Sequence, residues 1–179
     1  MLDNCPKIDR RFSENCTWIT KGRIMAIIGI IGGDSQETAH LFLQMYQKKF
    51  SNIIHESYKI TESNGIDLVC IDENSISEPD IWIVQEAKQN WQPNNDSLLI
   101  INADGDSIPI HNKALSYGFN GKASVTASSV ADGAMQVCVQ RGFTTMNGQI
   151  IEPQEFKVVC PHDAKPINVL GAVAACTLF

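Results

Sequence analysis

The chain has 179 residues, of which 44% are apolar, and a formal net charge of −6. A chain of this length buries a sizeable core and folds as one domain without disulfides or metals. Its 14 lysines and arginines form no basic cluster, so we exclude nucleic acid as the main partner. The first residues lack a secretion signal, and the longest apolar run, residues 24–31, is too short to span a bilayer. We therefore expect a cytoplasmic protein with no membrane partner.

The six cysteines give no indication of a metal or redox site. They contain no Cys-x-x-Cys pair and show no ligand spacing with the four histidines. Cys70, Cys160 and Cys176 lie inside apolar runs, which predicts buried free thiols.

Residues 1–21 are polar and irregular, and we expect them to form an arm on a domain that spans residues 22–179. The uninterrupted apolar run at residues 24–31 predicts a buried parallel strand. Gly32 and Gly33 allow a sharp exit, and a helical period follows to about residue 50, with Asp34 as its cap and Glu37 completing a capping box. A strand that leads into a helix through glycines is a place where α/β proteins hold phosphate.

Further apolar runs predict more strands of a parallel, twisted sheet: residues 52–60, 66–71, 81–84 and 98–101. Asp72, Glu73 and Asp104 follow such strands and lie on the rim where open α/β sheets bind ligands. The alternative is that these three acids are solvated turn residues.

The pattern changes after residue 123. Residues 124–130, 135–143 and 155–160 predict strands, and Asn147-Gly148 marks a tight hairpin turn. A proline-initiated apolar helix is expected over residues 166–179. Either a partner or a second copy covers this helix, or it is buried in its own sheet. The predicted fold is α/β, a mainly parallel sheet flanked by helices with residues 24–31 near its middle, and an antiparallel hairpin unit in the C-terminal half.

Three motifs follow one another along the chain: Leu99-Ile-Ile-Asn-Ala-Asp104, Leu115-Ser-Tyr-Gly-Phe119 and Ile167-Asn-Val-Leu-Gly-Ala-Val-Ala-Ala175. Their order resembles that in the central, ATP-binding domain of the Mur ligases, which join amino acids in peptidoglycan synthesis. The resemblance covers most of residues 22–179 and implies a P-loop-like α/β domain. It places Gly29, Gly32, Gly33, Asp34 and Ser35 at the phosphate loop, and Asn168 at the nucleotide.

The functional interpretation depends on the positions at which this chain differs from the family's motifs. Gly33 stands in place of the phosphate-binding lysine, and Asp34 in place of the hydroxyl residue that holds magnesium. Asp34 also offers its own carboxylate to the helix N–H groups that a phosphate would use. Gly171 replaces a second asparagine of the family. Glu73 is a weak candidate for the family's metal-binding glutamate, and Asp72 fits that position equally well.

Two functions remain open. One is a degenerate, stand-alone Mur-ligase-like domain without catalysis or cofactor, which binds a metabolite, a protein partner or itself. A protein partner or a second copy would bind through the C-terminal helix. The sequence favours this function because phosphoryl transfer depends on the lysine and the magnesium site, and because we expect no substrate-binding or carboxy-terminal domain. The other is a reduced component of an ATP-dependent acid–amino-acid ligase that uses Mg-ATP.

Overall fold

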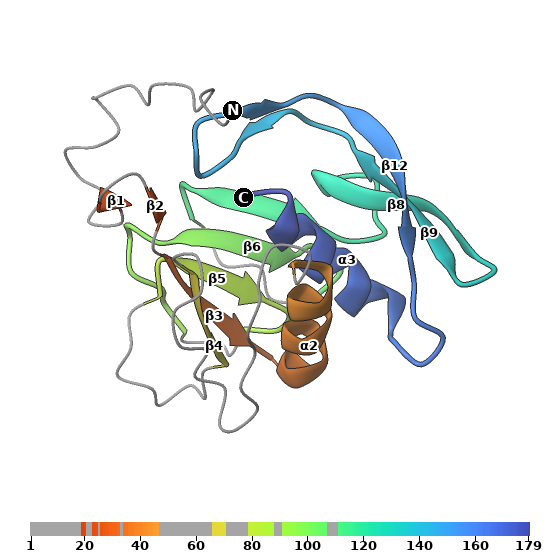
Figure 1. Ribbon diagram of the computed structural model, residues 1–179, viewed down its shortest axis with the longest axis horizontal. Coiled ribbons are helices and arrows are strands. Elements are labelled where there is room, and N and C mark those ends of the chain that lie inside the picture. Colours follow the sequence, from red (N-terminus) through yellow and green to blue (C-terminus); the bar gives the residue numbers. More distant parts are fainter. Residues whose placement is uncertain are drawn as a thin grey trace, which may run out of the picture.

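The computed structural model describes residues 19–20, 23–24, 26–32, 34–46, 66–70, 79–87, 91–106 and 111–179. In this part of the chain, an eight-stranded sheet has the order β12-β9-β8-β7-β6-β5-β3-β4, and helices α2 (Ser35–Tyr46) and α3 (Pro166–Cys176) lie side by side against it (Figure 1). The strands are β3 (Ala26–Ile31), β4 (Ile66–Cys70), β5 (Ile81–Val84), β6 (Leu98–Asn102), β7 (Ala114–Tyr117), β8 (Val125–Ala131), β9 (Ala134–Val139) and β12 (Gln154–Val159). Two small sheets pair β1 (Ile19–Thr20) with β2 (Arg23–Ile24) and β10 (Phe143–Thr144) with β11 (Ile150–Ile151).

The sheet is mainly parallel with an antiparallel unit, as the sequence predicts. From β4 to β8 every neighbouring pair is parallel, whereas β8, β9 and β12 pair antiparallel. The expected position of β3 near the middle is wrong. Among the described strands β3 is second from one end, because only β4 lies on one side of it and all the others extend from its other side. The possible strand at residues 52–60 lies outside the described residues.

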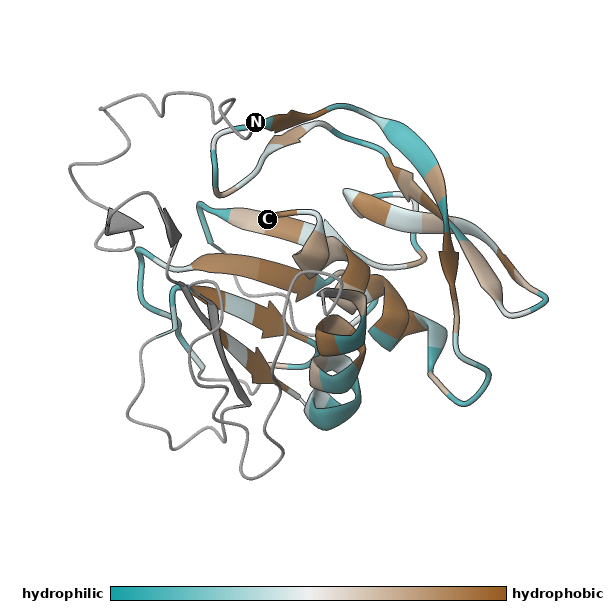
Figure 2. Ribbon diagram, in the orientation of Figure 1, coloured by the Kyte–Doolittle hydropathy of each residue, from teal (hydrophilic) through white to brown (hydrophobic). Residues whose placement is uncertain are grey.

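Strands β3 and β5 contain no polar side chain, in keeping with burial on both faces of the sheet. Ile28, Ile30 and Ile83 belong to the core that packs against the two helices, while Trp82 and Val84 belong to a second cluster on the other face. All four residues of β5 are buried. Figure 2 shows hydrophobic strands, a largely hydrophobic α3, and polar residues on the outer side of α2.

Helix α3 is buried within its own chain. It begins at a proline, and residues 168–175 are all buried. Phe179, just beyond it, packs edge-on against Phe42 of α2, with ring centroids 6.4 Å apart. This is the second of the two alternatives for the apolar helix, so α3 offers little surface to a partner.

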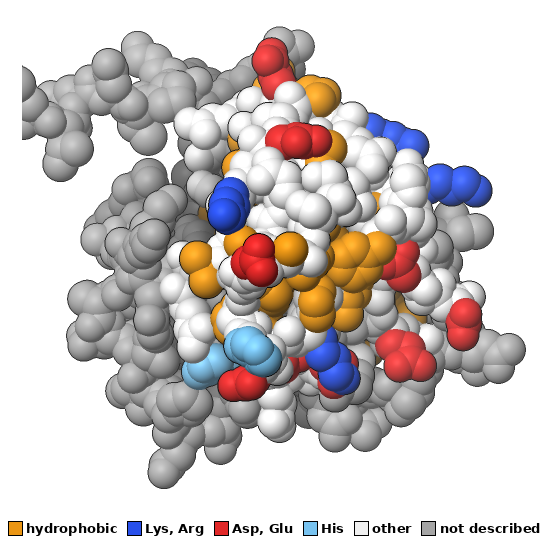
Figure 3. All heavy atoms as spheres, turned by 90° about the vertical axis from the view of Figure 1, so that its right-hand side faces the viewer, with side chains coloured by type: hydrophobic (Ala, Val, Ile, Leu, Met, Phe, Trp, Pro, Cys, Tyr) orange, Lys and Arg blue, Asp and Glu red, His pale blue; other side chains and the backbone are white. Residues whose placement is uncertain are grey.

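The antiparallel unit alternates buried and exposed positions. Met135, Val137 and Val139 of β9 are buried, whereas the residues between them are partly exposed. The turn predicted at Asn147-Gly148 joins β10 to β11, and Gly148 has a φ of +81°. Figure 3 views the molecule from the right-hand side of Figure 1 and shows hydrophobic side chains gathered between charged ones on that face. None of the described helices has the length and apolar character needed to cross a membrane.

Candidate functional site

The strand order places a topological switch point at the carboxyl ends of β3 and β5. The chain leaves β3 for β4 on one side, and then returns to β5 on the other side of β3. Open α/β sheets bind ligands at such a point. Gly32 follows β3 and Gln85 follows β5, and the Gln85 N–H donates to the Ile31 carbonyl at 2.9 Å. We call the residues around these two strand ends and the starts of α2 and α3 the switch-point corner.

The connection from β3 to α2, where the resemblance places the end of the phosphate loop, is short. Only residues 32–34 separate the last residue of β3 from the first residue of α2. Gly29, expected in this loop, lies inside β3 opposite Trp82. A Cβ on Gly29 would lie 2.6 Å from Pro79 and 2.8 Å from the Trp82 ring, so packing explains this glycine. Gly33 lies outside the described residues.

Gly32 is required by its backbone and by a close neighbour. Its φ is +128°, and a Cβ there would lie 2.7 Å from Cβ of Gln85. The glycine therefore lets the exits of β3 and β5 approach each other. The N–H of Ser35, which a phosphate would use, donates to the Gly32 carbonyl at 3.2 Å.

Asp34 forms an ion pair with a residue 131 positions away. Its Oδ2 accepts a hydrogen bond from Nζ of Lys165 at 2.7 Å, and the two side chains are 40% and 62% exposed. This hydrogen bond lowers the pKa of the Asp34 carboxyl, with a further contribution from Asn168, and it raises the pKa of Lys165. The charge of Lys165 is therefore paired with a carboxylate of the same chain.

Behind this ion pair, a partly buried hydrogen-bond network joins α2, α3 and the end of β5. Glu37 accepts from the Lys165 N–H at 3.3 Å through Oε1 and from the Asn168 side-chain amide through Oε2. Oδ1 of Asn168 accepts from Nε2 of Gln85 at 2.8 Å, and that nitrogen also donates to Thr38 Oγ1 at 2.5 Å. Asn168 is 3% exposed. The sequence predicted that the Glu37 carboxylate would cap α2. Instead, both of its oxygens accept hydrogen bonds from residues at the start of α3.

The side-chain oxygen of Gln85 leaves an unused hydrogen-bond acceptor in the switch-point corner. Oε1 of Gln85 is buried and has no hydrogen-bond partner among the described residues. It would lie 3.3 Å from a Cβ on Gly32, so it faces the exit of β3. Phosphate needs donors and positive charge, but here Lys165, Ser35 and Asn168 each donate to a group of the chain itself, and the oxygen of Gln85 adds an acceptor.

Of the three acids expected on the rim, the structure describes Asp104. Its carboxylate accepts from the N–H of Phe119 at 2.6 Å and from the N–H of Asn120 at 3.1 Å. Asp104 therefore ties the exits of β6 and β7 together and is a turn residue. Gly118, directly after β7, has a φ of +156°, and a Cβ there would lie 2.9 Å from that carboxylate. Asp72 and Glu73 lie outside the described residues. The described residues contain no group of three or more His, Cys, Asp or Glu able to hold a metal.

Gly171 also has a packing reason. A Cβ at this position would lie 3.0 Å from Cζ of Tyr117, whose side chain is 1% exposed. Burial, together with the charge of Asp104, raises the pKa of Tyr117. The Tyr117 ring thus occupies the space into which an asparagine at position 171 would extend.

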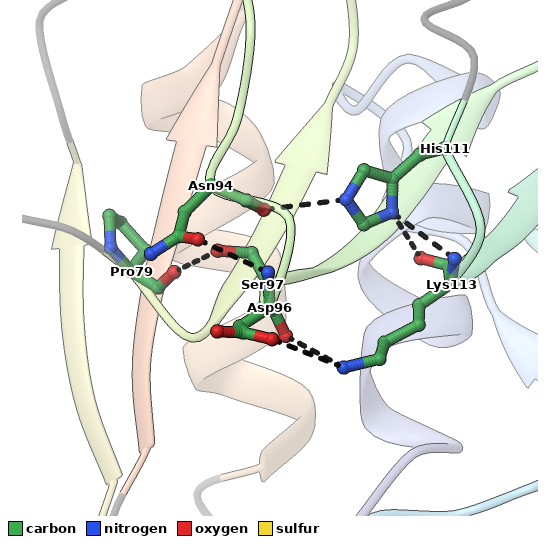
Figure 4. A network of polar contacts seen from close by, with 6 residues as sticks. All are labelled: Pro79, Asn94, Asp96, Ser97, His111 and Lys113. Atoms are coloured by element: carbon green, nitrogen blue, oxygen red, sulfur yellow. Dashed lines mark hydrogen bonds and ion pairs between the residues drawn. The ribbon is translucent and has the colours of Figure 1, made fainter.

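A second polar cluster lies at the opposite edge of the sheet, before β5, β6 and β7 (Figure 4). Ser97 donates from Oγ to the Pro79 carbonyl at 2.7 Å, and Lys113 donates from Nζ to the Asp96 carbonyl at 3.3 Å. His111 accepts the Lys113 N–H through Nδ1 at 3.2 Å and contacts the Asn94 carbonyl through Nε2 at 3.3 Å. These contacts hold three connections to one another, so we assign the cluster to stability.

Sequence reasoning missed Thr38, Gln85 and Lys165 of the corner. Gln85 carried a usable signal, because it directly follows the apolar run of β5 and polar residues at strand ends line the binding edge. Lys165 carried none, since its partner is far away in the sequence.

The fold and the corner together define an open, mainly parallel α/β domain whose switch point is filled by its own side chains. Among solved structures the fold is similar to that of UDP-N-acetylmuramoyl-L-alanyl-D-glutamate–2,6-diaminopimelate ligase, with a TM-score of 0.53 and 11% identity. This likeness covers 88% of this chain and 43% of that chain, so the chain spans less than half of the ligase's length. That enzyme is a Mur ligase, and at this identity the comparison shows a Mur-ligase-like fold alone. No protein-family model and no curated protein matches the sequence.

Proposed function

We propose that this chain is a degenerate Mur-ligase-like domain that does not catalyse ATP-driven ligation and acts by binding a metabolite, a protein partner or a second copy. One observation carries the proposal. At the start of α2, the Asp34 carboxylate holds Lys165 at 2.7 Å in the corner where the resemblance places nucleotide phosphates.

Electrostatics explains why this arrangement opposes nucleotide binding. Phosphoryl transfer depends on cations placed around the transferred group and on groups that hold magnesium. The corner offers a triphosphate the carboxylates of Asp34 and Glu37 and the buried Oε1 of Gln85, all of which are acceptors. An incoming phosphate would have to displace Asp34 from Lys165 and would meet like charges.

The alternative function is a component of an ATP-dependent acid–amino-acid ligase in peptidoglycan or related peptide synthesis. Two observations favour it: the likeness to the diaminopimelate ligase, and the position of Lys165, which precedes α3 in the chain but contacts Asp34 at the start of α2. If Asp34 released Lys165, the cation would replace the lysine that the loop lacks, and Mg-ATP would be the cofactor.

Isothermal titration calorimetry with Mg-ATP separates these functions. We expect no binding by the wild type at millimolar nucleotide. Asp34→Asn removes the negative charge but keeps the shape, so Lys165 is freed and at least tenfold tighter binding is expected than for the wild type. Asp34→Asn combined with Lys165→Met is the matched control, and it should lose this gain.

Micromolar binding of Mg-ATP by the unaltered protein would contradict the proposal and favour the ligase component. Equal binding by the single and double variants would show that Lys165 is not the neutralised cation of the corner.

A further inference from the structure

Strand β12 forms one end of the sheet. It pairs with β9 over its whole length, from Gln154 opposite Val139 to Val159 opposite Ala134. Among the described strands, none pairs with its other edge. Val159 is 76% exposed. An unpaired edge presents a row of backbone donors and acceptors to any strand that fits it.

The register with β9 determines which backbone groups point to this free edge. The Cys160 N–H donates to the Gly133 carbonyl at 2.9 Å, one step beyond the last register pair. In an antiparallel ladder, successive residues point their backbone groups to opposite sides. Phe156 and Val158 therefore bond toward β9, whereas Glu155, Lys157 and Val159 direct their N–H and carbonyl groups away from it.

We propose that a second copy of this chain binds this edge, β12 against β12 in antiparallel orientation, with the two-fold axis at Phe156. In this register Glu155 lies opposite Lys157 of the second copy, and Lys157 lies opposite its Glu155. Both residues are exposed and have the backbone groups that point outward. The pairing therefore joins hydrogen bonds and opposite charges at the same two positions.

Neighbouring registers are disfavoured by the same charges. Centring the pairing on Lys157 places two lysines opposite each other, and centring it on Glu155 places two glutamates opposite each other. Like charges directly opposite are destabilising, whereas opposite charges stabilise a pair. Of the three registers centred on Glu155, Phe156 and Lys157, only the one centred on Phe156 pairs opposite charges.

Phe156 adds an apolar contact at the axis. It is partly buried and packs against the main core, as does Val158. Two Phe156 residues opposite each other form a non-hydrogen-bonded pair, the type in which Cα atoms approach to about 4.5 Å and side chains lie closest. An aromatic pair there would continue the core from one copy into the other.

Charge reversal tests this proposal by sedimentation velocity. The wild type should be a dimer at tens of micromolar. Glu155→Lys or Lys157→Glu turns both attractive pairs into repulsive ones, so each should raise the dimer dissociation constant about tenfold or more. The double variant Glu155→Lys with Lys157→Glu restores both pairs and should return close to the wild-type value. Lys122→Glu, an exposed change in the turn between β7 and β8, is the matched control and should leave the dimer intact.

A wild type that remains a monomer would overturn the proposal and show that the charges keep this edge free. Failure of the double variant to recover would also overturn it, provided that circular dichroism shows the variants to be folded. The edge lies at the far end of the strand order from β3, and no nucleotide is used. Failure here is therefore distinguishable from failure of the proposed closed corner.

Discussion

The parallel and antiparallel halves of the sheet differ in how their polar groups are paired. Around β3 and β5, both faces are buried, and the side chains at the strand ends bond to one another across α2 and α3. In the antiparallel half, alternate side chains reach solvent, and the outermost strand keeps one edge unpaired among the described strands. In this fold the side chains of the region that the family resemblance marks as functional bond mostly to one another, with Oε1 of Gln85 as the exception, while the outermost described strand has an unpaired edge.

The largest expected difference between the two halves is in the free energy of unfolding lost when a side chain is shortened. Leu170 of α3 is fully buried, so Leu170→Ala should lower the free energy of unfolding by about 3 kcal/mol. Val130 of β8 is 44% exposed, and Val130→Ala should change that free energy by less than about 0.5 kcal/mol. Urea denaturation measures both. Similar losses for the two variants would contradict the division between a dense helical half and an open hairpin half.

A smaller effect is expected inside the corner. Asn168→Ala removes a donor from Glu37 and an acceptor from Gln85, and it should lower the free energy of unfolding by about 2 kcal/mol. Urea denaturation at pH 7 is again the measurement. A loss of a few tenths of a kcal/mol would mean that the network does not hold the corner closed.

Lys165→Met is the matched control, since it breaks the exposed ion pair and leaves the Asn168 network in place. The expected loss at pH 7 is much smaller than that of Asn168→Ala, because both side chains of the ion pair are exposed to solvent. The pKa of Asp34 is lowered in the folded protein, so this contribution is present above about pH 4 and disappears as the pH falls through the folded pKa. The difference between wild type and Lys165→Met should therefore shrink as the pH falls through the folded pKa of Asp34. A difference that grows with acidity would contradict the assignment.

Much of the fold is predictable because apolar runs report burial directly. The strand at residues 81–84 is found with the predicted bounds, and Pro166 starts its helix as expected. The strand order is not encoded in periodicity, so the position of β3 near one end could not be inferred. Strand β7 was not recognised as a strand, because its four residues include a serine and an exposed alanine.

The corner was predictable in position but not in its contacts. Glycines between a strand and a helix located it, yet the partners of Asp34 and Glu37 come from a loop more than 120 residues later. The sequence predicted a capping box, because local spacing offers Glu37 only a nearby backbone N–H as a partner. Tertiary structure brought Lys165 and Asn168 to these carboxylates instead.

The most direct test of the closed corner is a crystal structure of the wild type grown with Mg-ATP. The expected result is Lys165 Nζ on the Asp34 carboxylate, near the present 2.7 Å, with no nucleotide density at the start of α2. A triphosphate bound to the Ser35 N–H, with Lys165 turned away from Asp34 toward it, would contradict the account and place the protein among nucleotide-binding ligase domains.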